Sequence, residues 1–421
     1  MHHVIIGNSA AAISAIEAIR RVDQDNPITV ISDEPYAPYS RPLITYWLGG
    51  KITEERMDLR PPDFYEKHGV TPLLGRKAVS IDPQARTVSL EDGQSVSYDR
   101  LLIATGGLPF VPPIEGADRP GVYTFTRRAD AAAVMDVLDD VSHAVVIGAG
   151  LIGCKVVEAL YWRNVPCTVV ELASHVLVTA LDEVACRLME EHLGELGIEV
   201  RTNDTVAAIL GDEERVTGVR LKSGEELACD IVIIAIGVRP NAELAQSAGC
   251  EVNRGIVVNE RMETSVNDIY AAGDCVEAPD ALTGEVRPIP IWPLAFRQGA
   301  VAGTNMAGGE ARYERGFVMN SIEVCGLPTI SCGLYNPPDS ENYEILSTLD
   351  ESRRAYRKVV LRDNRVVGAC LVNAIDRAGV LTGLIREGID VTGFKEHLLD
   401  ETFSVAYLPA EWRAEKLAKA V

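Results

Sequence analysis

Short apolar runs alternate along the chain with longer stretches of helical periodicity, which is the pattern of parallel strands joined by helices. A strand is predicted at residues 4–7, a helix at 10–21 and a strand at 28–32. The same order recurs at residues 144–148, 151–162 and 167–171. The sequence therefore predicts two folds of the dinucleotide-binding type within residues 1–175.

Further buried strands are predicted to run into glycine turns, at residues 98–103, 230–236 and 268–272. From about Val318 the pattern changes to short strands and turns, which predicts a separate α+β module. Its expected elements are strands at 318–324, 343–348, 355–361 and 366–372, a hairpin tip at Asp363-Asn364, a helix at 378–386 and a helical tail from Pro409.

Composition narrows the class of protein. The 421 residues suffice for about two to four domains. The net charge of −21 disfavours nucleic acid and anionic lipid as partners, which leaves solubility or a basic partner as its role. No apolar run reaches the length of a membrane-spanning helix. Because a strand is predicted from residue 4, we expect no signal peptide and a cytoplasmic location.

The nine cysteines are widely spaced and include no Cys-x-x-Cys pair. This spacing is typical of reduced thiols and predicts that the chain holds no metal. Any metal cluster in an electron path is therefore expected on another protein.

The first candidate for cofactor binding follows the first predicted strand. Gly7-Asn8-Ser9-Ala10-Ala11-Ala12 is a Gly-x-Gly-x-x-Gly motif with Ser9 and Ala12 at its second and third positions. Small residues let the backbone approach a pyrophosphate at the helix N-terminus. Asp33 and Glu34 end the next strand, where an acid can bind a ribose hydroxyl. A tight strand-to-helix turn without a ligand is the alternative.

The second candidate, Gly148-Ala149-Gly150-Leu151-Ile152-Gly153, matches the motif in full. Glu171 ends the following strand, at the spacing expected of the ribose-binding acid. A carboxylate there favours the 2′-hydroxyl of NADH and repels the 2′-phosphate of NADPH, so NADH is the predicted nucleotide. Two such folds in one chain predict two dinucleotides, and a flavin is the natural partner of a nicotinamide.

With these motifs the chain resembles the FAD-dependent pyridine nucleotide oxidoreductases. The similar branch contains rubredoxin reductases, ferredoxin reductases, NADH oxidases, apoptosis-inducing factor and the flavin portion of assimilatory nitrite reductases. The resemblance spans residue 4 to about residue 310 and, more weakly, the C-terminal module. Besides the glycine motifs it rests on Asp33-Glu34-Pro35, Tyr39-Ser40-Arg41-Pro42, Ala104-Thr105-Gly106-Gly107, Gly237-Val238-Arg239-Pro240-Asn241, Thr264 and Ala271-Ala272-Gly273-Asp274.

The resemblance implies an α/β fold class with two Rossmann-like dinucleotide-binding domains of the glutathione-reductase type and a small α+β C-terminal domain. The implied FAD domain is discontinuous, with residues 1–110 and 240–310. The implied NADH domain covers residues 111–239, and the C-terminal domain covers residues 311–421.

The resemblance also implies roles for individual residues. For FAD these are Gly7, Asn8, Ser9, Ala10, Ala11 and Ala12 at the pyrophosphate, Asp33 and Glu34 at the adenosine ribose, Arg41 at the phosphates, the Val79 backbone at adenine, Ala104, Thr105 and Gly106 beneath the cofactor, Gly273 and Asp274 at the ribityl chain, and Leu294 and Ala295 beginning a helix that points at the flavin. For NADH they are Gly148, Gly150, Leu151, Ile152, Gly153, Glu171 and Gly237. Trp292 is interpreted as a core residue.

The departures from the family pattern concern redox chemistry. Coenzyme A disulfide reductases and peroxide-reducing relatives carry a redox cysteine where this chain has Pro42. The Cys pair that disulfide reductases carry on their first long helix and a C-terminal His-x-x-x-x-Glu pair are also absent. Cys275 is interpreted as a small core or turn residue. We therefore expect no protein thiol to relay electrons.

Lys155 is a second departure, because many relatives have a glutamate at this position. Ferredoxin-reductase-like relatives have a flavin-contacting lysine where this chain has Tyr46. We hypothesise that Lys155 replaces that lysine as a catalytic residue, near the flavin N5–O4 edge or a carboxylate beside it. The alternative is a solvated surface lysine.

The resemblance implies hydride transfer from NADH to FAD, followed by electron transfer to an external acceptor. Without a thiol relay, the expected acceptor is a small iron–sulfur or rubredoxin-type carrier protein. Two alternatives stay open. One is an NADH oxidase that reduces oxygen directly, and the other is a redox-sensing flavoprotein in which NADH changes the conformation.

Overall fold

The computed structural model describes residues 1–314, 316–338 and 342–419. The chain forms two compact units, each built from separated stretches of sequence. Unit 1 comprises residues 1–112, 123–140 and 236–316, and unit 2 comprises residues 113–122, 141–235 and 317–421. Residues 123–140, which the sequence assigns to the NADH domain, lie in unit 1. The division into three domains stays a prediction.

Unit 1 contains a five-stranded parallel sheet in the order β19-β7-β1-β2-β3. Its strands are β1 (His3–Ile6), β2 (Ile28–Ser32), β3 (Val70–Leu74), β7 (Arg100–Ile103) and β19 (Ile269–Ala271). Every residue of β1 and β2 is buried, as in a parallel sheet covered on both faces. The carboxyl ends of these strands share one edge of the sheet, which is where ligands of such folds bind.

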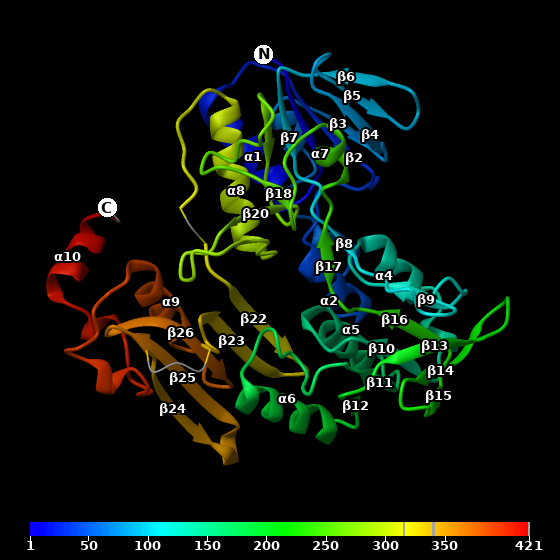
Figure 1. Ribbon diagram of the computed structural model, residues 1–421, viewed down its shortest axis with the longest axis vertical. Helices are drawn as coiled ribbons and strands as arrows, with labels where there is room; N and C mark the ends of the chain where they lie inside the picture. Colours follow the sequence, from blue (N-terminus) through cyan, green and yellow to red (C-terminus); the bar gives the residue numbers. More distant parts are fainter. Residues whose placement is uncertain (315, 339–341, 420–421) are drawn as a thin grey trace. The chain divides into compact units, whose positions relative to one another are not determined.

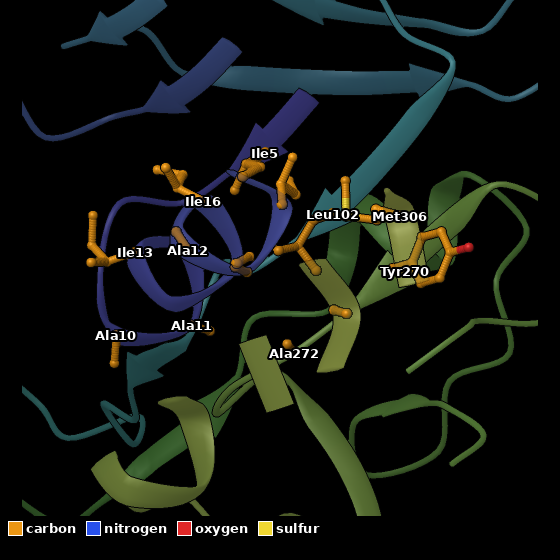
Figure 2. Packing of buried hydrophobic residues seen from close by; sticks show 14 of the residues in the cluster. Ile5, Ala10, Ala11, Ala12, Ile13, Ile16, Leu102, Tyr270, Ala272 and Met306 are labelled. Carbon is orange, nitrogen blue, oxygen red and sulfur yellow. The ribbon is translucent and has the colours of Figure 1, made fainter. Parts of the chain in front are cut away.

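Helices α1 (Ala10–Val22) and α8 (Trp292–Met306) lie side by side in unit 1 (Figure 1). Figure 2 shows Ile13 and Ile16 of α1 in one buried cluster with Ile5 and Leu102 of the sheet. The opposite face of the sheet presents Val4 and Ile6 to a second cluster, which includes residues of β4 (Ala78–Asp82), β5 (Thr87–Leu90) and α7 (Glu243–Ser247).

The second five-stranded sheet has the order β12-β11-β10-β16-β9, and all of its strands except β9 lie in unit 2. Its strands are β9 (Val122–Thr124), β10 (Ala144–Ile147), β11 (Cys167–Val170), β12 (Glu199–Arg201) and β16 (Ile231–Ile234). Strand β10 pairs in parallel with β11 and β16, as β1 pairs with β2 and β7 in unit 1. Helix α5 (Leu151–Trp162) follows β10 in the way that α1 follows β1.

The C-terminal part of unit 2 is an antiparallel sheet in the order β22-β23-β26-β25-β24. Its strands are β22 (Met319–Val324), β23 (Leu327–Gly333), β24 (Glu344–Asp350), β25 (Ala355–Arg362) and β26 (Arg365–Val372). Asp363 and Asn364 both have φ of +52°, as a two-residue hairpin turn between twisted strands requires. Helices α9 (Ala378–Glu387) and α10 (Ala410–Lys419) follow.

Smaller elements complete both units. In unit 1 these are α2 (Ile44–Leu48), α3 (Phe64–Lys67), α4 (Arg128–Met135), α7 (Glu243–Ser247), β4 (Ala78–Asp82), β5 (Thr87–Leu90), β6 (Ser95–Ser97), β8 (Gly107–Pro109), β17 (Val238–Pro240), β18 (Ile256–Val257), β20 (Val276–Pro279) and β21 (Val286–Arg287). In unit 2 they are α6 (Glu183–Glu195), β13 (Val206–Gly211), β14 (Val216–Leu221) and β15 (Glu226–Ala228).

The predicted fold class is confirmed, and the predicted strands and helices of both dinucleotide-type folds are present. In the C-terminal module one strand was missed, because β23 was not expected between the strands near residues 318–324 and 343–348. Pro328 and several small polar residues obscure the strand pattern in this segment. In the structure, β23 nevertheless pairs on both sides, with β22 and β26. In the described part of the chain, no helix combines the length and the apolar content needed to cross a membrane.

Candidate functional site: two glycine loops

The first glycine loop begins where β1 ends. Gly7 has φ of +120°, and a Cβ at this position would lie 2.1 Å from the Ala104 carbonyl oxygen. Only glycine fits, because this φ is strained for other residues and the neighbouring strand leaves no space. The backbone is held there by hydrogen bonds from Gly7 N to Ile31 O and from Ala104 N to Ile6 O, both 2.8 Å.

Ser9 precedes α1 in an extended conformation, and its side chain makes no capping hydrogen bond to the helix. The N–H groups of a first helical turn have no partner within the helix, so an uncapped turn can donate to an anion. The Asn8 side chain fixes the loop from outside, since it donates to Tyr36 O at 3.1 Å and accepts from the Tyr65 hydroxyl at 2.8 Å.

The two acids after β2 are each paired with an arginine. Asp33 pairs with Arg127 at 2.8 Å, near the protein surface. Glu34 is buried and accepts hydrogen bonds from the Tyr39 hydroxyl at 2.7 Å and from Arg41. The same Arg41 donates to the Thr126 carbonyl oxygen, beside Arg127, at 2.9 Å.

The turn after β7 and the strand β4 present backbone to the same unit. Thr105 donates its hydroxyl proton to Asn241 O at 2.6 Å, and Gly106 O accepts from Asn241 N at 2.9 Å. Val79 lies at a register shift between β4 and β5, where Ala78 and Ser80 both pair with β5 and Val79 does not. A bulge of this kind leaves the peptide groups of Val79 outside the ladder.

Asp274 follows β19 and makes no side-chain hydrogen bond within the described residues. Burial raises the pKa of its carboxyl from 3.8 to about 6, and the nearby Arg41 partly opposes that rise. The preceding Gly273 has φ of +89° and donates its N–H to Gln298 of α8 at 2.9 Å. An acid with little solvent and no protein donor is suited to accept hydrogen bonds from ligand hydroxyls.

Helix α8 begins at Trp292, so the expectation that Leu294 and Ala295 begin it is corrected by two residues. Both lie in its first turn and are buried. Trp292 packs against the core, as predicted, and its ring centroid lies 5.7 Å from that of Phe296.

Taken together, these residues fit FAD. Unit 1 offers an uncapped helix N-terminus behind a glycine that no other residue can replace. It also offers an acid without a hydrogen-bond donor and a bulged strand with free peptide groups.

The second glycine loop lies between β10 and α5 of unit 2. Gly148 has φ of +98°, and a Cβ on Gly153 would lie 1.9 Å from the Gly148 carbonyl oxygen. Around Gly150, by contrast, no atom lies within 4 Å of an added Cβ. The loop is therefore tight on its inner side and open at its second glycine, which suits a ligand that approaches the backbone.

Glu171 is held against this loop by backbone amides. Its carboxylate accepts hydrogen bonds from Ala149 N at 2.6 Å and from Ala173 N at 2.8 Å. Leu151 and Ile152 form the first turn of α5 and are half-buried. Gly237 lies after β16 with φ of +120° and open space around it, and it belongs to unit 1.

Lys155 is mostly buried, with 17% of its side chain exposed. Its ammonium pairs with Glu158, one turn further along α5, and donates to the Glu323 carbonyl oxygen at 3.1 Å. The expectation that this lysine needs a partner agrees with the structure, and that partner is a carboxylate of its own helix. Its proposed approach to the flavin stays a prediction.

All nine cysteines lie in the described part of the chain and are free thiols, eight of them buried and Cys325 half-buried. Burial raises the pKa of every one, for example that of Cys275 to about 11. Cys275 donates to Ala272 O at 3.3 Å, as a core residue would. Within the described residues, no group of His, Cys, Asp and Glu side chains could hold a metal ion.

Residues 1–299 match the family model described as pyridine nucleotide-disulphide oxidoreductase. The chain belongs to this family. Residues 319–389 also match the model of the rubredoxin NAD+ reductase C-terminal domain. The resemblance seen in the sequence is confirmed, and this family member is an oxidoreductase that uses FAD and NAD(H).

Similar proteins differ in how much of their length the chain covers. The NADH-dependent phenylglyoxylate dehydrogenase subunit epsilon of Aromatoleum evansii is 32% identical over 420 residues, which cover 98% of each chain. The NAD(P)H nitrite reductase of Bacillus subtilis (strain 168) is 32% identical over 391 residues, which cover 92% of this chain and 48% of that protein. With a second B. subtilis relative covered to 51%, the chain spans about half the length of these curated relatives.

Among solved structures, the covalent putidaredoxin reductase–putidaredoxin complex is similar with a TM-score of 0.85. The two sequences are 27% identical, and the match covers 92% of this chain and 94% of that chain.

Two features of the sites were not predicted from the sequence. One is the glycine pair of α8, since a Cβ on Gly299 would lie 2.1 Å from Ala11 O and one on Gly303 would lie 2.3 Å from Ala15 O. Their Gly-x-x-x-Gly spacing was the signal that could have revealed them. The other is Glu158, a fully buried carboxylate on α5. Its apolar neighbours Val156 and Val157 indicated a buried helix but not a buried carboxylate.

Proposed function

We propose that the protein oxidises NADH, passes the electrons through FAD, and delivers them to a small iron–sulfur or rubredoxin-type carrier protein. Bound FAD supplies the chemistry that links two-electron donors to one-electron acceptors. The observation that carries the choice of acceptor is the state of the cysteines, because a buried thiol of raised pKa is a poor redox relay.

In unit 1, the proposed roles follow the geometry of the first loop. Gly7 to Ala12 receive the pyrophosphate at the uncapped start of α1, and Val79 offers its bulged peptide groups to adenine. Asp33 and Glu34 serve the adenosine ribose, with Arg41 as the cation for the phosphates. The remaining proposed contacts are Ala104, Thr105, Gly106, Gly273 and Asp274, with Leu294 and Ala295 placing the start of α8 near the flavin.

In unit 2, Gly148, Gly150 and Gly153 with the first turn of α5 receive the NADH pyrophosphate. Glu171 accepts from the 2′-hydroxyl of the ribose and disfavours a 2′-phosphate. Leu151 and Ile152 complete the proposed nucleotide site in unit 2, and the role of Gly237, a residue of unit 1, stays a prediction. Lys155 is proposed to stabilise the negative charge that FAD gains on reduction. Lys155→Met tests this role through slower NADH-driven bleaching of the flavin at unchanged FAD content.

Two similarities support a protein carrier. The C-terminal residues match a rubredoxin reductase domain, and putidaredoxin reductase has been captured in a complex with its carrier. The test compares anaerobic NADH oxidation with rubredoxin, with a [2Fe–2S] ferredoxin and without either. We expect rapid turnover with at least one carrier, and unchanged flavin reduction after the accessible thiols are alkylated.

The alternatives predict other results. Full turnover with oxygen alone, unimproved by a carrier, would identify an NADH oxidase. Very slow turnover with every acceptor would favour a redox sensor.

A further inference from the structure

The turn between β22 and β23 is hydrogen-bonded by polar side chains from two helices of unit 2, α5 and α6. Cys325 occupies this turn with φ of +50° and donates its N–H to a carboxylate oxygen of Glu158 at 2.8 Å. Lys155 donates to Glu323 O, and the His192 ring of α6 contacts Cys325 O at 3.0 Å. Three contacts thus fix the backbone of one short turn.

Glu158 is the centre of this arrangement. It is fully buried, and its second carboxylate oxygen pairs with Lys155. A buried charge is stable only where it is paired and hydrogen-bonded, and Glu158 obtains one of its partners from the C-terminal sheet. The first turns of α5 and the β22–β23 turn therefore depend on each other.

The same turns of α5 are connected to the second glycine loop. The Cys154 thiol donates to Ala149 O at 3.4 Å, while Ala149 N donates to Glu171 at 2.6 Å. Burial, with the neighbouring Cys325 thiol as the next cause, raises the pKa of Cys154. Hydrogen bonds thus lead from Glu171 through Ala149 to Cys154 on α5, and Glu158, one turn further along α5, bonds the β22–β23 turn.

We propose that Glu158 is a positioning residue that couples nucleotide binding at the second glycine loop to the order of the β22–β23 hairpin. The proposal rests on the NADH site of the proposed function. Binding of a pyrophosphate to the loop and the start of α5 stiffens that helix end, and Glu158 transmits the constraint to Cys325. Conversely, whatever contacts the hairpin alters the affinity for the nucleotide, because coupling between two sites is reciprocal.

Amide hydrogen exchange of the FAD-loaded full chain, with and without saturating NAD+, tests the coupling. We expect NAD+ to slow exchange in the glycine loop at residues 148–153. In the hairpin at residues 319–333, exchange should slow by roughly tenfold, the scale of ordinary coupling between sites. The Cys325 amide should show the largest change.

Glu158→Gln keeps an oxygen for the Cys325 amide but removes the charge that faces Lys155. We expect this variant to keep the NAD+ effect in the glycine loop and to lose it in the hairpin. Lys155→Met should do the same, and it serves as the second variant if Glu158→Gln does not fold.

Tyr356→Phe is the matched control. The Tyr356 hydroxyl donates to buried Asp182 at 2.8 Å, so this hydrogen bond joins β25 to the start of α6 and not to α5. Its hairpin should respond to NAD+ as the wild type does, although its basal exchange can rise.

Each outcome separates the coupling from the nucleotide site. A glycine loop that responds to NAD+ while the wild-type hairpin does not would overturn the coupling and leave the proposed function standing. Absence of any response in the loop would overturn both. A hairpin response that survives in Glu158→Gln and Lys155→Met would remove Glu158 from the pathway.

Discussion

The two glycine loops of this enzyme differ in where glycine is required for close packing. In unit 2, the third motif position is Gly153, and its α-hydrogen faces the Gly148 carbonyl oxygen where a Cβ would lie only 1.9 Å away. In unit 1, the third position is Ala12, which is fully buried in the core without a glycine. The tight contact of α1 is made instead with Gly299 and Gly303 of α8.

This difference teaches that a degenerate motif need not mean a weaker site. The first loop accepts alanine at its third position, and the closest approaches in unit 1 are made by other glycines: Gly7 against Ala104 O, and Gly299 and Gly303 of α8 against the α1 backbone. The acids differ in the same way. Glu171 is held by backbone amides next to its own loop, whereas Asp33 and Glu34 are each held by an arginine from another segment.

The largest effect is expected from a substitution in the second glycine loop. Gly153→Ala places a Cβ against the Gly148 oxygen, and forced overpacking of this kind costs about 1–3 kcal/mol or more. The specificity constant kcat/KM for NADH should therefore fall by roughly a hundredfold, with normal FAD content. Steady-state kinetics and the flavin absorbance of the purified variant measure both. Ala12→Gly is the matched change in the first loop, and a comparable loss there would contradict the comparison.

The next effect concerns Asp274, whose carboxyl group accepts no side-chain hydrogen bond within the described residues. The unfolded pKa of Asp274 is 3.8 and the folded value is about 6, so the folded state binds more protons between these values. The stability of the FAD-free protein should then fall as pH rises from about 4 to about 6, by up to about 3 kcal/mol. Asp274→Asn removes this loss. Thermal midpoints at pH 4, 5, 6 and 7 should show the variant gaining on the wild type only through that window, and a pH-independent gap would refute the assignment.

Gly299→Ala should disrupt the close contact between α8 and α1 in unit 1. The added Cβ meets Ala11 O, which we expect to cost about 1–3 kcal/mol and to release FAD more readily. Thermal melting followed by flavin fluorescence reports both. Gly194→Ala in α6 is the control, because no atom lies within 4 Å of its new Cβ and alanine favours a helix. Equal destabilisation by the two changes would show that the contact between α1 and α8 can accommodate an added methyl group, contrary to the close approach seen in the structure.

The smallest expected effect sharpens the contrast between the acids. Glu171→Ala should raise the ratio of NADPH to NADH efficiency by about tenfold, since a like charge near a 2′-phosphate is removed. Asp33→Ala should leave that ratio unchanged and alter only FAD affinity. The ratio of kcat/KM values for the two nucleotides decides the matter, and an unchanged ratio in Glu171→Ala would argue against its place at the ribose.

The sequence by itself determined the local features of this enzyme. Strands β1 and β10, helices α1 and α5 and both glycine loops follow from apolar periodicity and from the positions of small residues. Such features are readable because each depends on a few neighbouring side chains and on backbone sterics. The family resemblance rests on the same local motifs.

Only the tertiary structure decided which distant segments serve each site. It assigned residues 123–140 to unit 1, where Arg127 pairs with Asp33, and it gave Lys155 its partner in Glu158. It also put β23 between β22 and β26 and set the glycines of α8 against α1. These choices depend on contacts between residues far apart in the chain, and on the need to pair each buried charge, which no local pattern records.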